Sequence, residues 1–185
     1  MISSLTIHTQ RLDLVPAGQE ILTSDLHHDS EELGRLLDAT IPGAWPPPLL
    51  DDEALAEFVR IQADGSDPNF SSWYWIFTDP EERTRTLIGS SGFCSYPTAP
   101  DAVMIGYSVI DAFQNRGLAT EALRSLIPVI FQSSKIRQIV ATTYPALKAS
   151  IRVLEKTGFL PAGTTGGGEG MEEGTLLYVV KRSQE

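Results

Sequence analysis

The sequence predicts a single α/β domain, because short strand-like runs alternate with amphipathic helical runs along all of its 185 residues. A chain of this length can bury a proper core, so one domain over 1–185 is the simplest organisation. Its hydrophobic content of 42% is ordinary for a globular protein. No apolar run approaches the roughly 20 residues that span a bilayer.

The first 63 residues begin with alternating strand-like segments and continue with acidic helical ones. The stretch from Glu20 to Leu37 has apolar residues on one side and predicts one or two amphipathic helices. The next helix has Asp51 or Asp52 placed to cap it. The proline-rich segment around Trp45 cannot be regular structure, because proline removes a donor and fixes φ. In order, the expected segments are strands 5–9 and 12–15, helices within 20–37, the irregular 41–48, and helix 51–63.

The remainder alternates β-branched or aromatic runs with two helices. Gly89 and Gly92 in the middle strands indicate close packing or a bulge. Pro128 lies within the first of the two helices and should kink or stop it, while Gly158 ends the second. The expected segments are strands 73–77, 86–89, 91–96 and 104–110, helix 120–131, strand 138–143, helix 147–157, and strands 159–162 and 175–180.

The junction between strand 104–110 and the next helix is the most informative segment. Small residues at Gly117 and Ala119 allow backbone to approach a ligand closely. Free amides at a helix N-terminus, with the dipole behind them, form an anion site. A phosphate-bearing ligand is therefore the first hypothesis; a glycine that merely makes the turn is the alternative.

Charge is distributed unevenly. The net charge is −10, yet seven of the 14 Lys and Arg residues lie between Ala112 and Gly158, where Glu121 and Glu155 are the only acids. Positive charge thus surrounds the predicted anion site, although solvated helix faces would give the same pattern. The acidic chain is a poor non-specific nucleic-acid binder and is suited to attract a cationic amine.

Other features exclude several classes of protein. Cys94 is the single cysteine of the sequence, which excludes an internal disulfide and a multi-cysteine zinc site. The three histidines show no metal-ligand spacing, so no metal is expected. The first residues lack the pattern of a secretory signal, so a cytoplasmic location is expected. The glycine-rich 166–170 resembles a phosphate loop, but no Lys-Ser/Thr follows, and a hairpin connection is the simpler interpretation.

Three motifs occur in order along the chain: Ile105-Gly106-Tyr107-Ser108-Val109, Gln114-x-x-Gly117-x-Ala119-Thr120-Glu121-Ala122-Leu123, and Ser150-Ile151-Arg152-Val153-Leu154-Glu155-Lys156-x-Gly158-Phe159. With these motifs the chain resembles the GNAT superfamily of acetyl-CoA-dependent N-acetyltransferases, and most closely the branch of ribosomal-protein N-terminal alanine acetyltransferases. The opening Thr9-Gln10-Arg11-Leu12-Asp13-Leu14 and Trp45-Pro46 fit that branch too. The resemblance implies a mixed, mostly antiparallel sheet of about six to seven strands, splayed in the middle and flanked by helices on both faces.

The resemblance also implies where acetyl-CoA would bind. The pyrophosphate would sit on the amides of the turn, and the pantetheine arm would lie along the preceding strand as an added strand. Ser150 would contact the cofactor or protonate the leaving thiolate, and the alternative is a plain serine at the N-terminus of its helix. A backbone N–H would serve as the oxyanion donor. The implied cofactor residues are Tyr107, Ser108, Val109, Ile110, Gln114, Asn115, Arg116, Gly117, Leu118, Ala119, Thr120 and Ser150.

The chain departs from the family where acid–base chemistry is expected. Met104 stands where the family often has a glutamate base, Leu154 where other branches have a tyrosine acid, and Leu147 where an asparagine is usual. The base is therefore open, and a water chain could also serve. The other candidates are Asp101, Tyr107, Glu172 and Glu173.

The expected function is acetyl transfer to a primary amine in a ternary complex. The acceptor would be a peptide N-terminus, an amino compound or a polyamine, and Trp45 is a candidate to touch it. The alternative is a degenerate acyl-CoA-binding sensor or scaffold, motivated by Met104 and Leu154; a nucleotide-binding P-loop protein is a distant third. The expected partners are acetyl-CoA and the amine, with no nucleic acid or membrane, and the chain is expected to be a monomer or homodimer.

Overall fold

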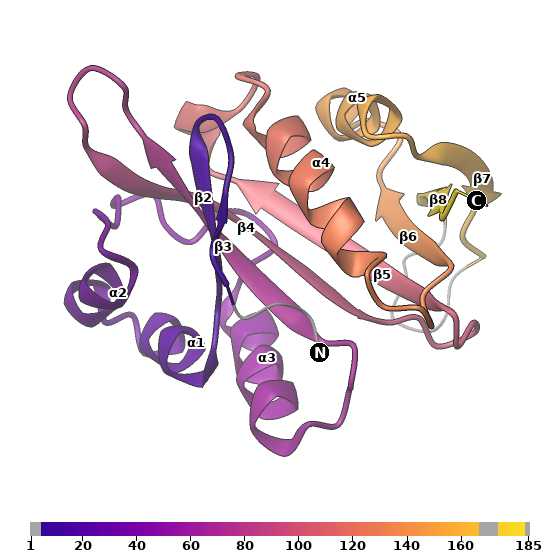
Figure 1. The fold of residues 1–185 in the computed structure, drawn as a ribbon, viewed down its shortest axis with the longest axis horizontal. Coiled ribbons are helices and arrows are strands. Elements are labelled where there is room, and N and C mark those ends of the chain that lie inside the picture. Colours follow the sequence, from indigo (N-terminus) through magenta and orange to yellow (C-terminus); the bar gives the residue numbers. More distant parts are fainter. Residues whose placement is uncertain (1–4, 167–173, 184–185) are drawn as a thin grey trace.

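The computed structural model describes residues 5–166 and 174–183. Its strands form one sheet in the order β1-β2-β3-β4-β5-β6-β8-β7, in which only the β5–β6 pair is parallel (Figure 1). The mixed, mostly antiparallel sheet is confirmed, with eight strands in place of six to seven. The strands are β1 Ile7–His8, β2 Leu12–Pro16, β3 Ser71–Thr78, β4 Arg85–Ser95, β5 Ala102–Val109, β6 Gln138–Thr143, β7 Leu160–Thr164 and β8 Leu176–Lys181.

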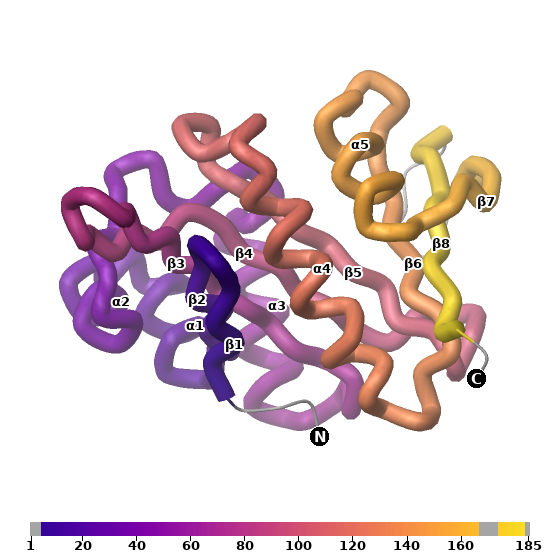
Figure 2. The backbone as a smooth tube through the Cα atoms, turned by 45° about the horizontal axis from the view of Figure 1, so that its top comes forward, coloured from indigo at the N-terminus to yellow at the C-terminus, as the bar shows by residue number. Residues whose placement is uncertain are grey.

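Helices cover both faces of the sheet, as expected. Alternation along β3 explains why both faces are apolar, because Trp73 and Trp75 point into one core cluster and Tyr74 and Ile76 into the other. The first cluster is completed by α4 and α5, and the second by α1, α2 and α3. The helices are α1 Gln19–Leu26, α2 Ser30–Leu37, α3 Asp52–Asp64, α4 Leu118–Ile130 and α5 Lys148–Lys156. Figure 2 shows the hairpin β1–β2 lying beside α4.

Local capping explains where the N-terminal helices begin. The stretch 20–37 forms two helices, because the Asp29 side chain accepts a hydrogen bond from the Glu32 amide and starts α2. Asp51 caps α3 in the same way through the Ala54 amide at 2.9 Å, as the sequence predicts.

Two expectations from the sequence are wrong in detail. Segments 86–89 and 91–96 belong to one strand, β4, whose pairing with β3 shifts register beside Gly89. Gly89 is closely packed at this point, because a Cβ there would lie 2.7 Å from the Ser108 carbonyl oxygen of β5. Of the kink or stop expected at Pro128, the stop does not occur, because α4 continues to Ile130 and only two residues of the helix follow the proline.

Candidate functional site

The sheet opens between β5 and β6. These parallel strands pair only from Ala102–Met104 to Gln138–Val140 and then diverge, whereas β4 stays paired with β5 as far as Val109 (Figure 1). Among the residues that the structure describes, the edge of β5 beyond Met104 therefore has no strand partner on its β6 side. An unpaired edge of this kind can accept an extended ligand as an additional strand.

The turn between β5 and α4 begins where this open edge ends. Gln114 anchors it, because its Nε2 donates to the Val109 carbonyl oxygen at 2.9 Å and to the Asp111 carboxylate at 3.0 Å. Asn115 and Gly117 have positive φ values of 58° and 78°, so the chain alternates in handedness as it enters the helix. Such an alternation turns successive N–H groups towards one concave side, which is an anion-binding arrangement.

The amides of this turn are available to a ligand. Among the residues that the structure describes, the backbone N–H groups of residues 115–120 donate to no acceptor, whereas the Glu121 amide already bonds to the Gly117 carbonyl oxygen. Free amides and the positive end of the α4 dipole together favour a phosphate. The structure thus brings together the predicted turn and the predicted strand edge.

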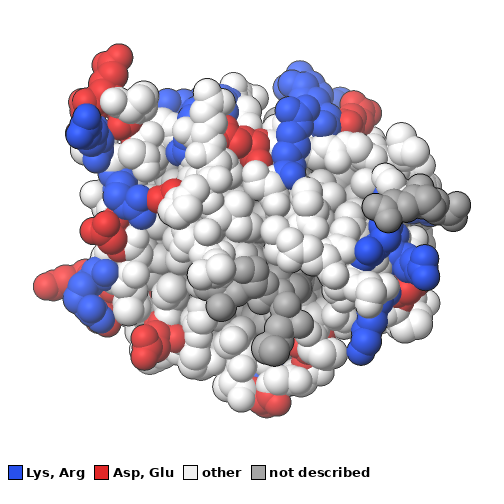
Figure 3. Space-filling model, viewed as in Figure 1, with Lys and Arg blue, Asp and Glu red and all other residues white. Residues whose placement is uncertain are grey.

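Basic side chains lie around the same end of the molecule. Figure 3 shows Lys and Arg side chains gathered at the top of the view, over the region of α4 and α5. Arg116 is stacked, with its guanidinium carbon 5.1 Å from the centre of the Phe77 ring and 5.0 Å from that of Phe113. These cation–π contacts hold the positive charge beside the turn.

Tyr107 and Ser150 meet across the opening. The Tyr107 hydroxyl lies 3.1 Å from Ser150 Oγ and donates to the Ser150 carbonyl oxygen at 3.3 Å, and Ser150 lies in the first turn of α5. Burial raises the pKa of Tyr107, and the hydrogen bond with Ser150 offsets this only in part. Tyr107 is therefore protonated at neutral pH, and its hydroxyl can donate a hydrogen bond towards Ser150.

The residues at the family's acid–base positions have different surroundings. Leu154 is fully buried in the core, so that position is structural. Met104 is half-buried opposite Cys94 in the β4–β5 ladder. Leu147 precedes α5 and is 46% exposed, without a side-chain cap.

Two of the candidate bases can be placed along β5. Asp101 precedes the strand and is about 20 Å from Tyr107 at the usual rise per residue, so the structure does not bring the two together. Glu172 and Glu173 lie outside the described residues, as do positions 167–170 of the glycine-rich stretch.

Trp45 belongs to a buried polar cluster that the sequence does not reveal. Its indole Nε1 donates to Asp25 Oδ1 at 2.7 Å, and the Tyr74 hydroxyl donates to the other carboxylate oxygen. Asp25 is only 3% exposed, and burial raises its pKa despite these two hydrogen bonds. No local pattern marks Asp25 or Tyr74, because both look like ordinary residues of a helix and a strand.

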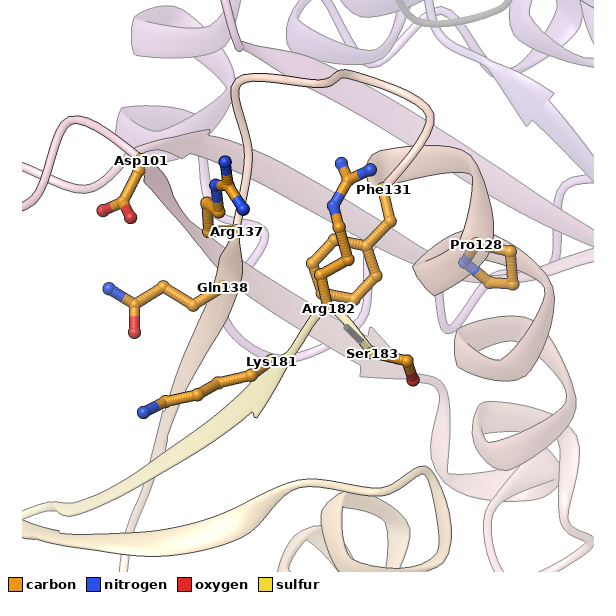
Figure 4. A pocket seen from close by; sticks show the side chains of 8 residues that line it. All are labelled: Asp101, Pro128, Phe131, Arg137, Gln138, Lys181, Arg182 and Ser183. Carbon is orange, nitrogen blue, oxygen red and sulfur yellow. The ribbon is translucent and has the colours of Figure 1, made fainter. Parts of the chain in front are cut away.

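A hollow of about 960 Å³ lies at the other end of β5. Figure 4 shows Asp101, Arg137, Gln138, Lys181 and Arg182 around it. Arg182 is already engaged, since it donates to the carbonyl oxygens of Ser133 and Ile136 and stacks 5.5 Å from the Phe131 ring centre. The hollow is separate from the opening between β5 and β6.

Among the described residues, no helix is long and apolar enough to cross a membrane. In the same part of the chain, no group of three or more His, Cys, Asp or Glu side chains is placed to hold a metal ion.

Comparison with known proteins agrees with this geometry. The family model described as "Acetyltransferase (GNAT) domain" matches residues 22–160. A curated relative, "Probable N-acetyltransferase YjcK" of Bacillus subtilis, is 37% identical over 87 residues, which are 46% of this chain and 46% of that protein. The match thus spans about half the length of that relative.

Solved structures share the fold at low identity. The ribosomal-protein-S5-alanine acetyltransferase of Vibrio fischeri has a TM-score of 0.61 at 17% identity, covering 96% of each chain. Mycobacterium smegmatis RimJ in complex with CoA-disulfide has a TM-score of 0.64 at 17% identity, covering 96% of this chain and 88% of that one. The family match over most of the chain, the shared fold and the open β5 edge beside a turn of free amides agree: the chain belongs to the GNAT family of acetyltransferases.

Proposed function

We propose that this protein transfers the acetyl group of acetyl-CoA to a primary amine by direct attack in a ternary complex. The observation that carries the proposal is the unpaired edge of β5, which leads directly to the free amides of residues 115–120. The strand edge suits the amide-containing pantetheine arm, and the turn suits the pyrophosphate.

The cofactor would be held mainly by backbone. Ser108 and Val109 would offer main-chain groups to pantetheine, Gly117 and Leu118 would offer amides to the pyrophosphate, and Ser150 would face the thioester end. The full set comprises Tyr107, Ser108, Val109, Ile110, Gln114, Asn115, Arg116, Gly117, Leu118, Ala119, Thr120 and Ser150.

In the reaction, the amine nitrogen attacks the thioester carbonyl carbon, and the C–S bond breaks as the amide forms. Ser150 would give a proton to the leaving thiolate and regain it from Tyr107, which its raised pKa keeps protonated before the reaction. The Tyr107 phenolate would then take a proton from solvent, which balances the proton that the amine releases. The attacking amine must be neutral; α-amines have a pKa near ~8, so a substantial fraction is free at neutral pH. Solvent water would take the amine's proton, because Met104 and Leu154 cannot. A thioester attacked beside a backbone N–H needs no metal in this scheme.

The acceptor class follows from the charge of the N-terminal layer. Arg35 and Arg60 are the only Lys or Arg between Gln19 and Asp64, and both are paired with carboxylates of their own helices. The remaining acids favour a cationic acceptor, namely a peptide N-terminus, a polyamine or another amino compound. Trp45, held by Asp25 at the edge of this layer, would contact it. We expect a cytoplasmic monomer or homodimer.

The test is release of CoA thiol from acetyl-CoA against a panel of N-terminal peptides, polyamines and amino compounds, with calorimetric acetyl-CoA binding measured in parallel. Acceptor-dependent thiol release supports the transferase and identifies the acceptor class. Tight binding with no turnover on any acceptor would instead favour a sensor or scaffold. This alternative is motivated by Met104 and Leu154, which are not titratable. Absence of binding would overturn the proposal.

A further inference from the structure

The hairpin β1–β2 is tied to the start of α4 by one arginine. Arg11 Nε and Nη2 reach Glu121 Oε2, each at 2.8 Å, and the Arg11 amide donates to Glu121 Oε1 at 2.7 Å. The Thr9 hydroxyl donates to the same Oε1 at 2.6 Å. Arg11 Nη1 is left to donate to the Arg116 carbonyl oxygen at 2.9 Å, within the turn of free amides.

The contact with the Arg116 carbonyl bears on the direction of an amide. In a trans peptide the C=O and N–H bonds point in opposite directions, so fixing the Arg116 carbonyl also fixes the Gly117 N–H. Gly117 has φ of 78° and no side chain, so the peptide before it could rotate at little steric cost. A hydrogen bond to its carbonyl is therefore what selects one orientation.

We propose that Arg11 is a positioning residue, which holds the Arg116–Gly117 peptide so that the Gly117 amide faces the cofactor's pyrophosphate. The inference rests on the proposed function, because it assumes that acetyl-CoA occupies the turn. Arg11 acts through the backbone and does not itself touch the cofactor. In this arrangement Glu121 and Thr9 fix the arginine, and Arg11 fixes the turn.

Glu121 is suited to this role because it is anionic and well enclosed. Its side chain is 16% exposed, and it accepts from three donors of the hairpin, counting the hydroxyl and amide as well as the guanidinium. Burial alone would raise the pKa of Glu121, but the hydrogen bonds from Thr9 and Arg11 outweigh it and lower the pKa. The carboxylate thus remains charged and keeps the guanidinium in place.

Arg85, the first residue of β4, supplies a matched control because it binds the same hairpin through Asp13. It pairs through Nη1 with the Asp13 carboxylate and donates through Nε to the Asp38 carbonyl oxygen at 2.8 Å. Arg85 and Asp13 have side-chain exposures of 32% and 17%, against 38% and 16% for Arg11 and Glu121. Arg85 therefore bridges a carboxylate and a carbonyl as Arg11 does, but away from the turn.

The experiment compares Arg11→Ala, Arg11→Lys and Arg85→Ala with wild type by calorimetric acetyl-CoA binding, thermal unfolding and the NMR amide signal of Gly117 in the free protein. We expect both Arg11 variants to bind acetyl-CoA roughly five- to tenfold more weakly, the range of one lost hydrogen bond. Lysine keeps the charge but cannot bridge Glu121 and the carbonyl as the guanidinium fork does. The Gly117 signal should shift or broaden in both, whereas Arg85→Ala keeps affinity within twofold and the signal unchanged.

Each result has a definite meaning. Unchanged affinity in Arg11→Ala would overturn the inference while leaving the proposed function intact. Full affinity in Arg11→Lys would also overturn it, because charge alone would then suffice. If Arg85→Ala lost as much acetyl-CoA affinity as Arg11→Ala, the inference would be overturned, because general destabilisation of the hairpin would then explain both losses. If wild-type protein binds no acetyl-CoA, the proposed function itself fails.

Discussion

Replacing Gly89 with alanine should separate β4 from β5 at the end of the open β5 edge, where Gly89 pairs with Val109. The added Cβ would lie 2.7 Å from the Ser108 carbonyl oxygen, 3.0 Å from Trp75 Cε3 and 3.3 Å from Val109 Cγ2. The carbonyl belongs to the β4–β5 ladder and Trp75 is fully buried, so neither can yield without loss of packing. We expect the free energy of unfolding to fall by about 2–3 kcal/mol, the usual cost of overpacking.

Gly92→Ala is the matched control for this change. Gly92 is also in β4 and also pairs with β5, but the nearest atoms to its added Cβ would be 3.7 and 3.8 Å away, which is ordinary contact. Alanine there should leave stability unchanged or raise it by about 0.4–1 kcal/mol, because it restricts the unfolded chain.

Urea and thermal unfolding of the two variants measure the difference. For a chain of this size 2–3 kcal/mol corresponds to a fall in Tm of roughly 4–12 °C. Gly89→Ala should also weaken acetyl-CoA binding, since Ser108 and Val109 lie on the strand assigned to pantetheine. Gly92→Ala should leave acetyl-CoA affinity unchanged. Equal stability of the two variants would refute the reasoning, because it would show that the contact at Ser108 relaxes freely.

Three further predictions concern the site itself. Gly117→Glu should abolish acetyl-CoA binding by calorimetry, because it places bulk and negative charge at the phosphates; unchanged affinity would rule out the pyrophosphate assignment. If the Ser150 hydroxyl is the acid, Ser150→Ala should lower kcat at least tenfold and change the Kd of acetyl-CoA less than threefold. Tyr107→Phe should lower kcat by a smaller factor. Equal losses of kcat and affinity in Ser150→Ala would show that Ser150 is a cofactor ligand only. Since the folded-state pKa of Glu121 is lowered, its stabilisation is complete above the ordinary carboxyl pKa of about 4.5 and is lost as the pH falls through the lowered value. The stability difference between wild type and Glu121→Gln should therefore shrink on going from pH 6 to below pH 4, and a difference independent of pH would contradict the assignment.

Sequence patterns sufficed where a single segment carries the information. The cap at Asp51, the strand 138–143 and the helix that follows Gly117 could all be read locally, because hydrogen bonds and burial within an element repeat with its own period. The motif from Gln114 to Thr120 predicted a turn with free amides for the same reason. The division of β4 at Ser90 was wrong, because Ser90 is paired with Tyr74 of β3 and with Ser108 of β5, and this pairing depends on strands that are separate in the sequence.

Contacts between distant segments were decided only by the tertiary structure. Arg11 lies 105 residues from Arg116 and 43 residues separate Tyr107 from Ser150, so no local spacing could indicate that either pair meets. Likewise, the buried carboxylate of Asp25 acquires its partners from a strand and a proline-rich loop far along the chain. The sequence by itself determined most of the strands and helices and the position of the turn before α4, because periodicity and capping are local. The path of the chain determined which side chains meet, and therefore what holds the turn in place and which hydroxyls face the opening between β5 and β6.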